Sequence, residues 1–274
     1  MSGGFRRRLE GLDAARGVAL LGMVAAHAIP EVEGSEFVWD GRSSILFATV
    51  AGVSLGLLSG GRHTPAAGSR GRVARVVALR AVLLVVLGIA LVALETPIAI
   101  ILDTYGFLFA VAIPLLFAPR WLLAVVAAAA ALLGPWVVET LTLQSELAQG
   151  TTREMLDSPW AFFPQAWVTG VYPAPVWLAY LAVGILIARC DLRSPRTQIA
   201  LVAIGSATAA AVYLVADALG DPVVAHSDTS AEVLASGGVA VAVIGLLVWL
   251  TSSAPDALAG TARRILYPVS AAGS

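Results

Sequence analysis

The chain contains no lysine, one cysteine, three histidines and few charged residues of any kind. All seventeen of its basic residues are arginines, and the single Cys190 excludes an internal disulfide. Only 13% of the 274 residues are charged and 58% are hydrophobic, whereas about 25% of a soluble domain is charged. This scarcity of charge excludes an ordinary soluble protein and predicts an integral membrane protein.

Several familiar signatures are also missing from the sequence. No spacing of histidine, cysteine or carboxylate residues is typical of a metal site, and there is no Ser-His-Asp set. No glycine-rich phosphate loop and no nucleic-acid-binding motif is present. We therefore expect neither a metal nor a nucleic acid as a partner.

Long apolar runs dominate what remains. A bilayer is crossed by about twenty apolar residues. Eight segments qualify, at 13–30, 43–60, 75–94, 97–117, 121–138, 173–189, 198–217 and 232–252. A ninth begins near Ile265 and is cut off at Ser274. The sequence predicts an all-α, polytopic membrane bundle of eight complete spans and a truncated ninth, in one domain over 1–274 whose C-terminal end is incomplete.

The arginines alternate between the connections. They precede the first span and follow the second, fourth, sixth and eighth: Arg6, Arg7, Arg8, Arg62, Arg70, Arg72, Arg75, Arg120, Arg189, Arg193, Arg196, Arg263 and Arg264. The other connections are acidic, and only Arg42 and Arg153 lie there. The positive-inside rule places the N-terminus in the cytoplasm of a multi-pass protein of a bacterial cell membrane.

One outer connection, 139–172, is unusually long and rich in aromatic residues, among them Trp160 and Trp167. It is interpreted as an anchor at the membrane interface or as a lid over an acceptor groove. In the second span, Gly52, Gly56 and Gly60 form a series of small residues that predicts close packing against another helix.

Ionisable residues within predicted spans are the candidate functional residues, because each costs roughly 2.5–3.5 kcal/mol to insert. Asp13 and Arg16 lie near the cytoplasmic end of the first span, and His27 lies near its outer end. Arg80 lies on the cytoplasmic side of the third span, and Asp103 in the outer half of the fourth.

Arg16 and His27 share one face of the first helix, since eleven residues separate them by about 16 Å along the axis and return to nearly the same direction. In one interpretation Arg16 reaches the interface beside Asp13 and His27 is a satisfied interior histidine. In the other, this stripe lines a passage that serves both sides of the membrane.

A CoA thioester fits the second interpretation. Arg16 and Arg80 would hold its phosphates, with Asp13 positioning Arg16, because guanidinium groups match phosphate geometry. His27 would act as general base or would carry the acyl group. Asp103, or Asp40, would orient the imidazole.

Outer polar residues are candidates for contact with an acceptor. Arg42 either pairs with Asp40 or binds an acidic or hydroxylated acceptor, and His226 is either a surface histidine or an acceptor contact. The spacing of the first helix does not distinguish an acyltransferase from a proton-coupled transporter or a lipid or glycolipid flippase. A scaffold subunit is the third alternative.

The chain resembles a group of membrane acyltransferases. Arg16, ten residues and His27 match the R-X10-H pattern of acyltransferase family 3. The whole chain is more similar to YeiB-like and heparan-α-glucosaminide N-acetyltransferase-like membrane proteins. Five stretches carry that similarity: "RLEGLDAARGVALLGMVAAH", "DGRSSILFATVAGVSLGLLSGG", "ILDTYGFLFAVAIPLL", "YPAPVWLAYLAVGILIARCDLRS" and "HSDTSAEVLASGGVAVAVIGLLVWL".

The resemblance implies transfer of an acyl group, expected to be acetyl, from cytoplasmic acyl-CoA to an extracytoplasmic carbohydrate or glycolipid. It implies an active-site histidine near the outer face, at His27 by the R-X10-H match. Acyl-CoA is the expected donor and no metal is expected. Membrane lipids and the acceptor are the expected partners, and a homo-oligomer is left open.

Overall fold

The computed structural model describes residues 9–29, 37–94, 98–146 and 165–274, with side chains to residue 142 in the third of these ranges. The described residues form helices and contain no strand. The helices are α1 (Glu10–Ala28), α2 (Arg42–Leu58), α3 (Ala67–Val92), α4 (Leu102–Leu115), α5 (Arg120–Glu146), α8 (Ala174–Ala188), α9 (Pro195–Leu219), α10 (Ser230–Ser252) and α11 (Asp256–Ala272). The all-α class is confirmed, and each of the eight complete predicted segments overlaps a helix.

Four helices are long and apolar enough to cross a membrane: α3, α5 over Arg120–Thr142, α9 and α10. Three shorter apolar helices, α2, α4 and α8, accompany them. Helix α1 is not in either group, because Glu10, Asp13 and Arg16 lower its hydropathy. The structure thus has the helices of a membrane protein, with α1 as a more polar element among them.

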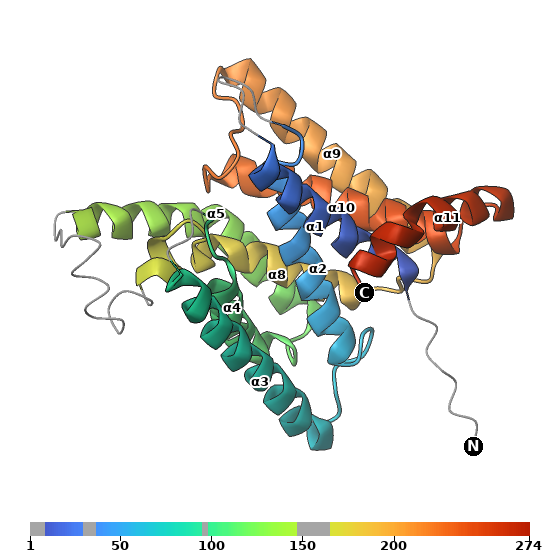
Figure 1. Ribbon diagram of the computed structural model, residues 1–274, viewed down its shortest axis with the longest axis horizontal. Helices are drawn as coiled ribbons and strands as arrows, with labels where there is room; N and C mark the ends of the chain where they lie inside the picture. Colours follow the sequence, from blue (N-terminus) through green and yellow to red (C-terminus); the bar gives the residue numbers. More distant parts are fainter. Residues whose placement is uncertain (1–8, 30–36, 95–97, 147–164) are drawn as a thin grey trace.

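Helix α8 lies at the centre of the bundle, between α2 and α5, and α3–α4 and α9–α10 form two neighbouring pairs on either side (Figure 1). Small residues allow the close contact of α2 with α8. A Cβ atom at Gly52 would collide with the Leu181 carbonyl, and one at Gly184 with the Thr49 carbonyl. The predicted packing role of Gly52 and Gly56 is confirmed, since Gly56 faces Ala188 in the same way.

Helix α11 corrects the prediction for the end of the chain. It begins at Asp256, so the arginines assigned to a loop, Arg263 and Arg264, lie in the middle of a helix. The helix buries Ala259 and Ala262, which are three residues apart, and packs along α1 (Figure 1). It is an amphipathic helix rather than a span that begins near Ile265.

The long connection predicted at 139–172 begins later than expected, because α5 continues to Glu146. Its residues 147–164, including Trp160, lie outside the described residues. Trp167 lies in the short helical turn that follows, and its ring stacks on Phe107 of α4 with 5.0 Å between the centroids. The end of this connection therefore packs on the bundle.

A candidate donor-binding cavity

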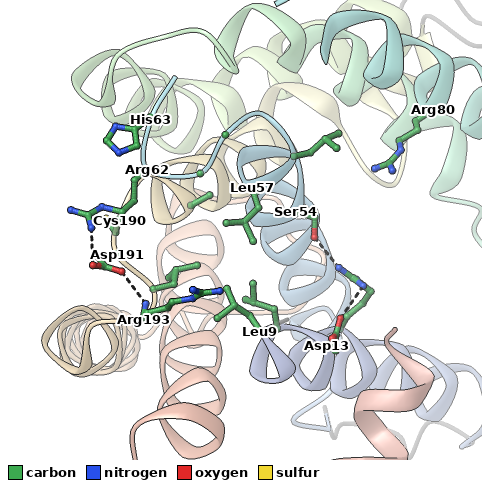
Figure 2. Close-up of a pocket in the computed structure, with 17 residues that line it drawn as sticks. Leu9, Asp13, Ser54, Leu57, Arg62, His63, Arg80, Cys190, Asp191 and Arg193 are labelled. Atoms are coloured by element: carbon green, nitrogen blue, oxygen red, sulfur yellow. Dashed lines mark hydrogen bonds and ion pairs between the residues drawn. The ribbon is translucent and has the colours of Figure 1, made fainter. Parts of the chain in front are cut away.

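A cavity of about 690 Å³ opens where the start of α1, the end of α2 and the α8–α9 turn meet (Figure 2). Four arginines and two aspartates line it: Arg16, Arg62, Arg80, Arg193, Asp13 and Asp191. The side chain of His63 and apolar side chains such as Leu57 complete the wall. The cavity, hereafter the basic cavity, carries an excess of positive charge and has the volume of a small-molecule site.

Arg16 connects three helices at one side of the basic cavity. Its Nη2 donates to Ser54 Oγ at 2.8 Å and its Nη1 donates to the Gly273 carbonyl at 2.6 Å. Asp13 Oδ1 lies 3.7 Å from Nη1, which confirms the predicted Asp13–Arg16 pair. Arg16 therefore joins α1 to α2 and to the end of α11 while its guanidinium lines the cavity.

The other cavity arginines differ in how firmly they are held. Arg62 pairs with Asp191 at 2.8 Å, and the Arg193 amide donates to the same carboxylate at 3.2 Å. Arg80 stands at the opposite side, away from Asp191 (Figure 2), and its exposed guanidinium makes no hydrogen bond or ion pair within the described ranges. Of the four, Arg80 is the cation most available to a ligand.

Arg189 holds the turn that forms the cavity wall. Its side chain is 1% exposed, and its guanidinium donates to the carbonyls of Gly61 and Leu116, each at 2.6 Å, and to Ser59 Oγ at 3.1 Å. Gly60 and Gly61 have φ of 116° and 64°, which favour glycine. A guanidinium remains charged at neutral pH, so the hydrogen bonds of Arg189 are charge-assisted.

The sequence did not identify Arg62, Arg193, His63 or Arg189 as site residues, because arginines in connections were used only to orient the chain. They meet because α2 and α8 pack closely and end at the same level, which brings their following turns together. The prediction that two arginine-rich connections lie on the same side of the membrane was the available signal.

His27 and Asp103 are not brought together. His27 is exposed at the C-terminal end of α1, and neither residue lines the basic cavity. Asp103 lies in the first turn of α4, is 4% exposed, and accepts a hydrogen bond from Trp167 Nε1 at 2.8 Å. The predicted contact of Asp103 with the His27 ring is therefore corrected: Asp103 joins α4 to Trp167.

The two ends of the predicted stripe on α1, Arg16 and His27, lie in different environments. The Arg16 end contacts α2 and α11 and lines the cavity, whereas His27 at the other end is exposed. His27 does not line the basic cavity that contains Arg16. The two ends of the predicted stripe therefore do not share that cavity.

Arg42, predicted to pair with Asp40 or to bind an acceptor, takes a different partner. Its Nε donates to Tyr213 Oη at 2.9 Å, and its Cζ lies 5.6 Å from the centre of that ring. It reaches only the Asp40 main-chain carbonyl, at 3.4 Å, while the Asp40 carboxylate accepts from the Phe37 amide at 2.7 Å. Arg42 thus joins α2 to α9.

Two carboxylate residues, Asp228 and Glu232, lie close to His226 and were not identified from the sequence. Glu232 is 2% exposed, and its carboxylate accepts from the amides of His226 at 2.6 Å and Asp228 at 2.7 Å. His226 itself is exposed, with its ring 6.1 Å from that of Tyr172. The pattern Thr229-x-x-Glu232 was the available signal, because it is a helix-capping motif and the Thr229 hydroxyl accepts from the Glu232 amide.

Asp228 should make the stability of the protein depend on pH. Burial and the neighbouring Glu232 raise the pKa of Asp228 from 3.8 to about 7. The folded state then binds more protons than the unfolded state between these values, so the free energy of unfolding should fall as pH rises from about 4 to 7. Asp228→Asn should remove this slope and, since each pKa unit corresponds to about 1.4 kcal/mol, stabilise the protein at pH 8 by up to about 4 kcal/mol.

Denaturant titrations at pH 5 and pH 8 measure both values. Asp221→Asn is the matched control, because Asp221 lies in the same connection and is exposed. An unchanged slope in Asp228→Asn would contradict the assignment to this carboxyl.

Within the described residues, no three histidine, cysteine, aspartate or glutamate side chains gather as a metal site. Compared with protein-family models, with curated proteins and with solved structures, the chain gave no match. The basic cavity is thus the feature of the structure from which a function can be argued.

Proposed function

We propose that the protein is a multi-pass membrane acyltransferase that binds cytoplasmic acyl-CoA in the basic cavity and acylates an extracytoplasmic carbohydrate or glycolipid. The observation that carries the proposal is the gathering of Arg16, Arg62, Arg80 and Arg193 around one cavity. The spacing of Arg16 and His27, which resembles the R-X10-H pattern of membrane acyltransferases, favours the same class.

Membrane insertion is supported by where the apolar side chains lie. On α3, Leu79, Val82, Leu83 and Val86 are each more than half exposed, and α3 is one of the four helices long enough to cross a bilayer. Exposing such an apolar surface to water is unfavourable, whereas its contact with lipid chains is not. The proposal places the arginine-rich turns in the cytoplasm of a bacterial cell, by the positive-inside rule.

The residues of the basic cavity suit the donor. Acyl-CoA carries several anionic phosphate oxygens, and guanidinium groups bind such oxygens through two parallel hydrogen bonds. Arg80 is available for this, and Arg16 is held in place by Ser54 and Asp13 so that its guanidinium faces the cavity without rearrangement. The mixed wall, with Leu57 and other apolar groups, suits the less polar parts of the molecule.

The proposed chemistry uses His27 as general base. An acceptor hydroxyl or amine attacks the thioester carbonyl, and His27 takes its proton. A bond forms between the carbonyl carbon and the acceptor, the carbon–sulfur bond breaks, and the proton passes to the leaving thiolate. His27 stands about 16 Å along α1 from Arg16, so the arm of the donor must extend along α1 in the reacting complex.

The acceptor approaches His27 from outside in this proposal. Asp40, Arg42 and His226 remain candidate acceptor contacts, although Arg42 must leave Tyr213 to serve as one. In this proposal Asp103 holds the Trp167 side chain by a hydrogen bond and does not orient His27.

Acyl transfer by purified protein in liposomes tests the proposal. Labelled acetyl-CoA on the side of the basic cavity should label a mixture of oligosaccharides and bacterial glycolipids on the opposite side, with half-saturation between about 1 µM and 1 mM. Donor supplied on the other side should give no product. Transport of protons or lipid by the same liposomes, without labelled product, would instead favour the transporter or flippase.

A further inference from the structure

A second cavity adjoins the basic cavity. It has a volume of about 440 Å³ and shares Leu58, Gly60 and His63 with the basic cavity. Its remaining wall comes from the connection that follows and from the start of α3, including Thr64 and Arg72. The two cavities therefore lie on either side of one glycine-containing turn.

The second cavity presents cationic and hydrogen-bonding groups. Arg72 is exposed and makes no hydrogen bond or ion pair within the part of the chain that the structure describes. The hydroxyl of Thr64 and the ring of His63 line the same space. Helix α3 has 26 residues and begins after Ala66, which provides no side-chain cap, so the positive end of its dipole is open to an anion. No carboxylate lines this cavity.

We propose that the second cavity binds a phosphomonoester group of the same donor molecule whose diphosphate lies in the basic cavity. This inference rests on the proposed function and assigns a binding place to one group of the donor, the 3′-phosphate of CoA. In CoA the 3′-phosphate and the 5′-diphosphate are attached to one ribose. Two anion-binding cavities that share one turn match that arrangement.

Charge explains why a phosphomonoester suits the second cavity. A phosphomonoester carries nearly two negative charges at pH 7, because its second pKa is about 6. Arg72, without an acidic neighbour in the cavity wall, can direct its donors to such a group. In the basic cavity, by contrast, Asp13 and Asp191 neutralise part of the arginine charge.

Equilibrium binding of CoA and of 3′-dephospho-CoA to the purified full chain tests the inference. At low salt, the wild type should bind CoA about tenfold more tightly, since a hydrogen bond to a charged group contributes enough for that ratio. Arg72→Gln should weaken CoA binding to the level of 3′-dephospho-CoA and leave the affinity for 3′-dephospho-CoA unchanged. Arg75→Gln, on the same helix but outside both cavities, should behave as the wild type.

The outcomes separate the two proposals. Equal affinity of the wild type for both ligands would overturn the 3′-phosphate site while leaving CoA binding in the basic cavity intact. A tenfold preference that persists in Arg72→Gln would place the 3′-phosphate elsewhere and also overturn the inference. Failure of the wild type to bind either ligand would overturn both the inference and the proposed function.

Discussion

Replacing His27 with alanine should lower the rate of acyl transfer about 100-fold or more, because general-base catalysis typically contributes 10²–10⁴ to a rate. His27 is exposed at the end of α1 and lines neither of the cavities proposed for the donor. The affinity for acetyl-CoA should therefore change by less than about twofold. The liposome transfer assay and equilibrium binding measure the two quantities on the same preparation.

Val24→Ala is the matched control for this substitution. Val24 lies on α1 three residues before His27 and is 63% exposed, so its truncation should alter neither binding nor transfer. Transfer by His27→Ala at the wild-type rate would remove His27 from the mechanism. A loss of binding together with transfer would show that the change acts on the fold of α1 rather than on proton removal.

Replacing Arg189 with methionine should destabilise the protein more than any other single change considered. The substitution leaves the Gly61 and Leu116 carbonyls and the Ser59 hydroxyl without their buried donor. Each unsatisfied buried group costs about 1–3 kcal/mol. We expect the free energy of unfolding to fall by about 3 kcal/mol or more, the combined cost of leaving these buried acceptors without a donor.

Denaturant titration in detergent micelles, followed by circular dichroism, measures this loss. Arg196→Met is the control, because Arg196 is exposed on α9 and makes no hydrogen bond or ion pair with a described residue; its effect should stay within about 0.5 kcal/mol. Equal unfolding midpoints for Arg189→Met and the wild type would contradict the role of Arg189 in holding the turn.

The helices from α1 to α10 were predictable because each overlaps a long apolar run. The end of the chain was not, since Arg263 and Arg264 were interpreted as a connection. In the structure, Arg263 lies within α11 and donates to the Thr251 carbonyl at 2.6 and 2.8 Å. It also lies 3.5 Å from the Glu10 carboxylate. Such contacts join distant parts of the sequence and leave no local pattern.

The site was predictable only in part. Asp13, Arg16 and Arg80 line one cavity, as their shared level near one end of the bundle suggested. The sequence could not show that Asp103 lies beside Trp167 instead of His27, because the order of apolar segments does not specify which helices are neighbours. Arg189 was assigned to an arginine-rich connection, and its burial depends on the close packing of α2 and α8.

Arg80 gives the most direct test of whether the basic cavity binds the phosphates of acyl-CoA. Arg80 lines the cavity and has no hydrogen bond or ion pair to lose among the described residues. Its replacement with glutamine should therefore affect ligand binding rather than folding.

The decisive measurement is the dissociation constant of CoA for the wild type and for Arg80→Gln, at two salt concentrations. Binding should weaken as salt increases, and the dissociation constant should be about five- to tenfold higher in Arg80→Gln. Arg196→Gln should match the wild type. A dissociation constant that is the same in Arg80→Gln as in the wild type would contradict the account.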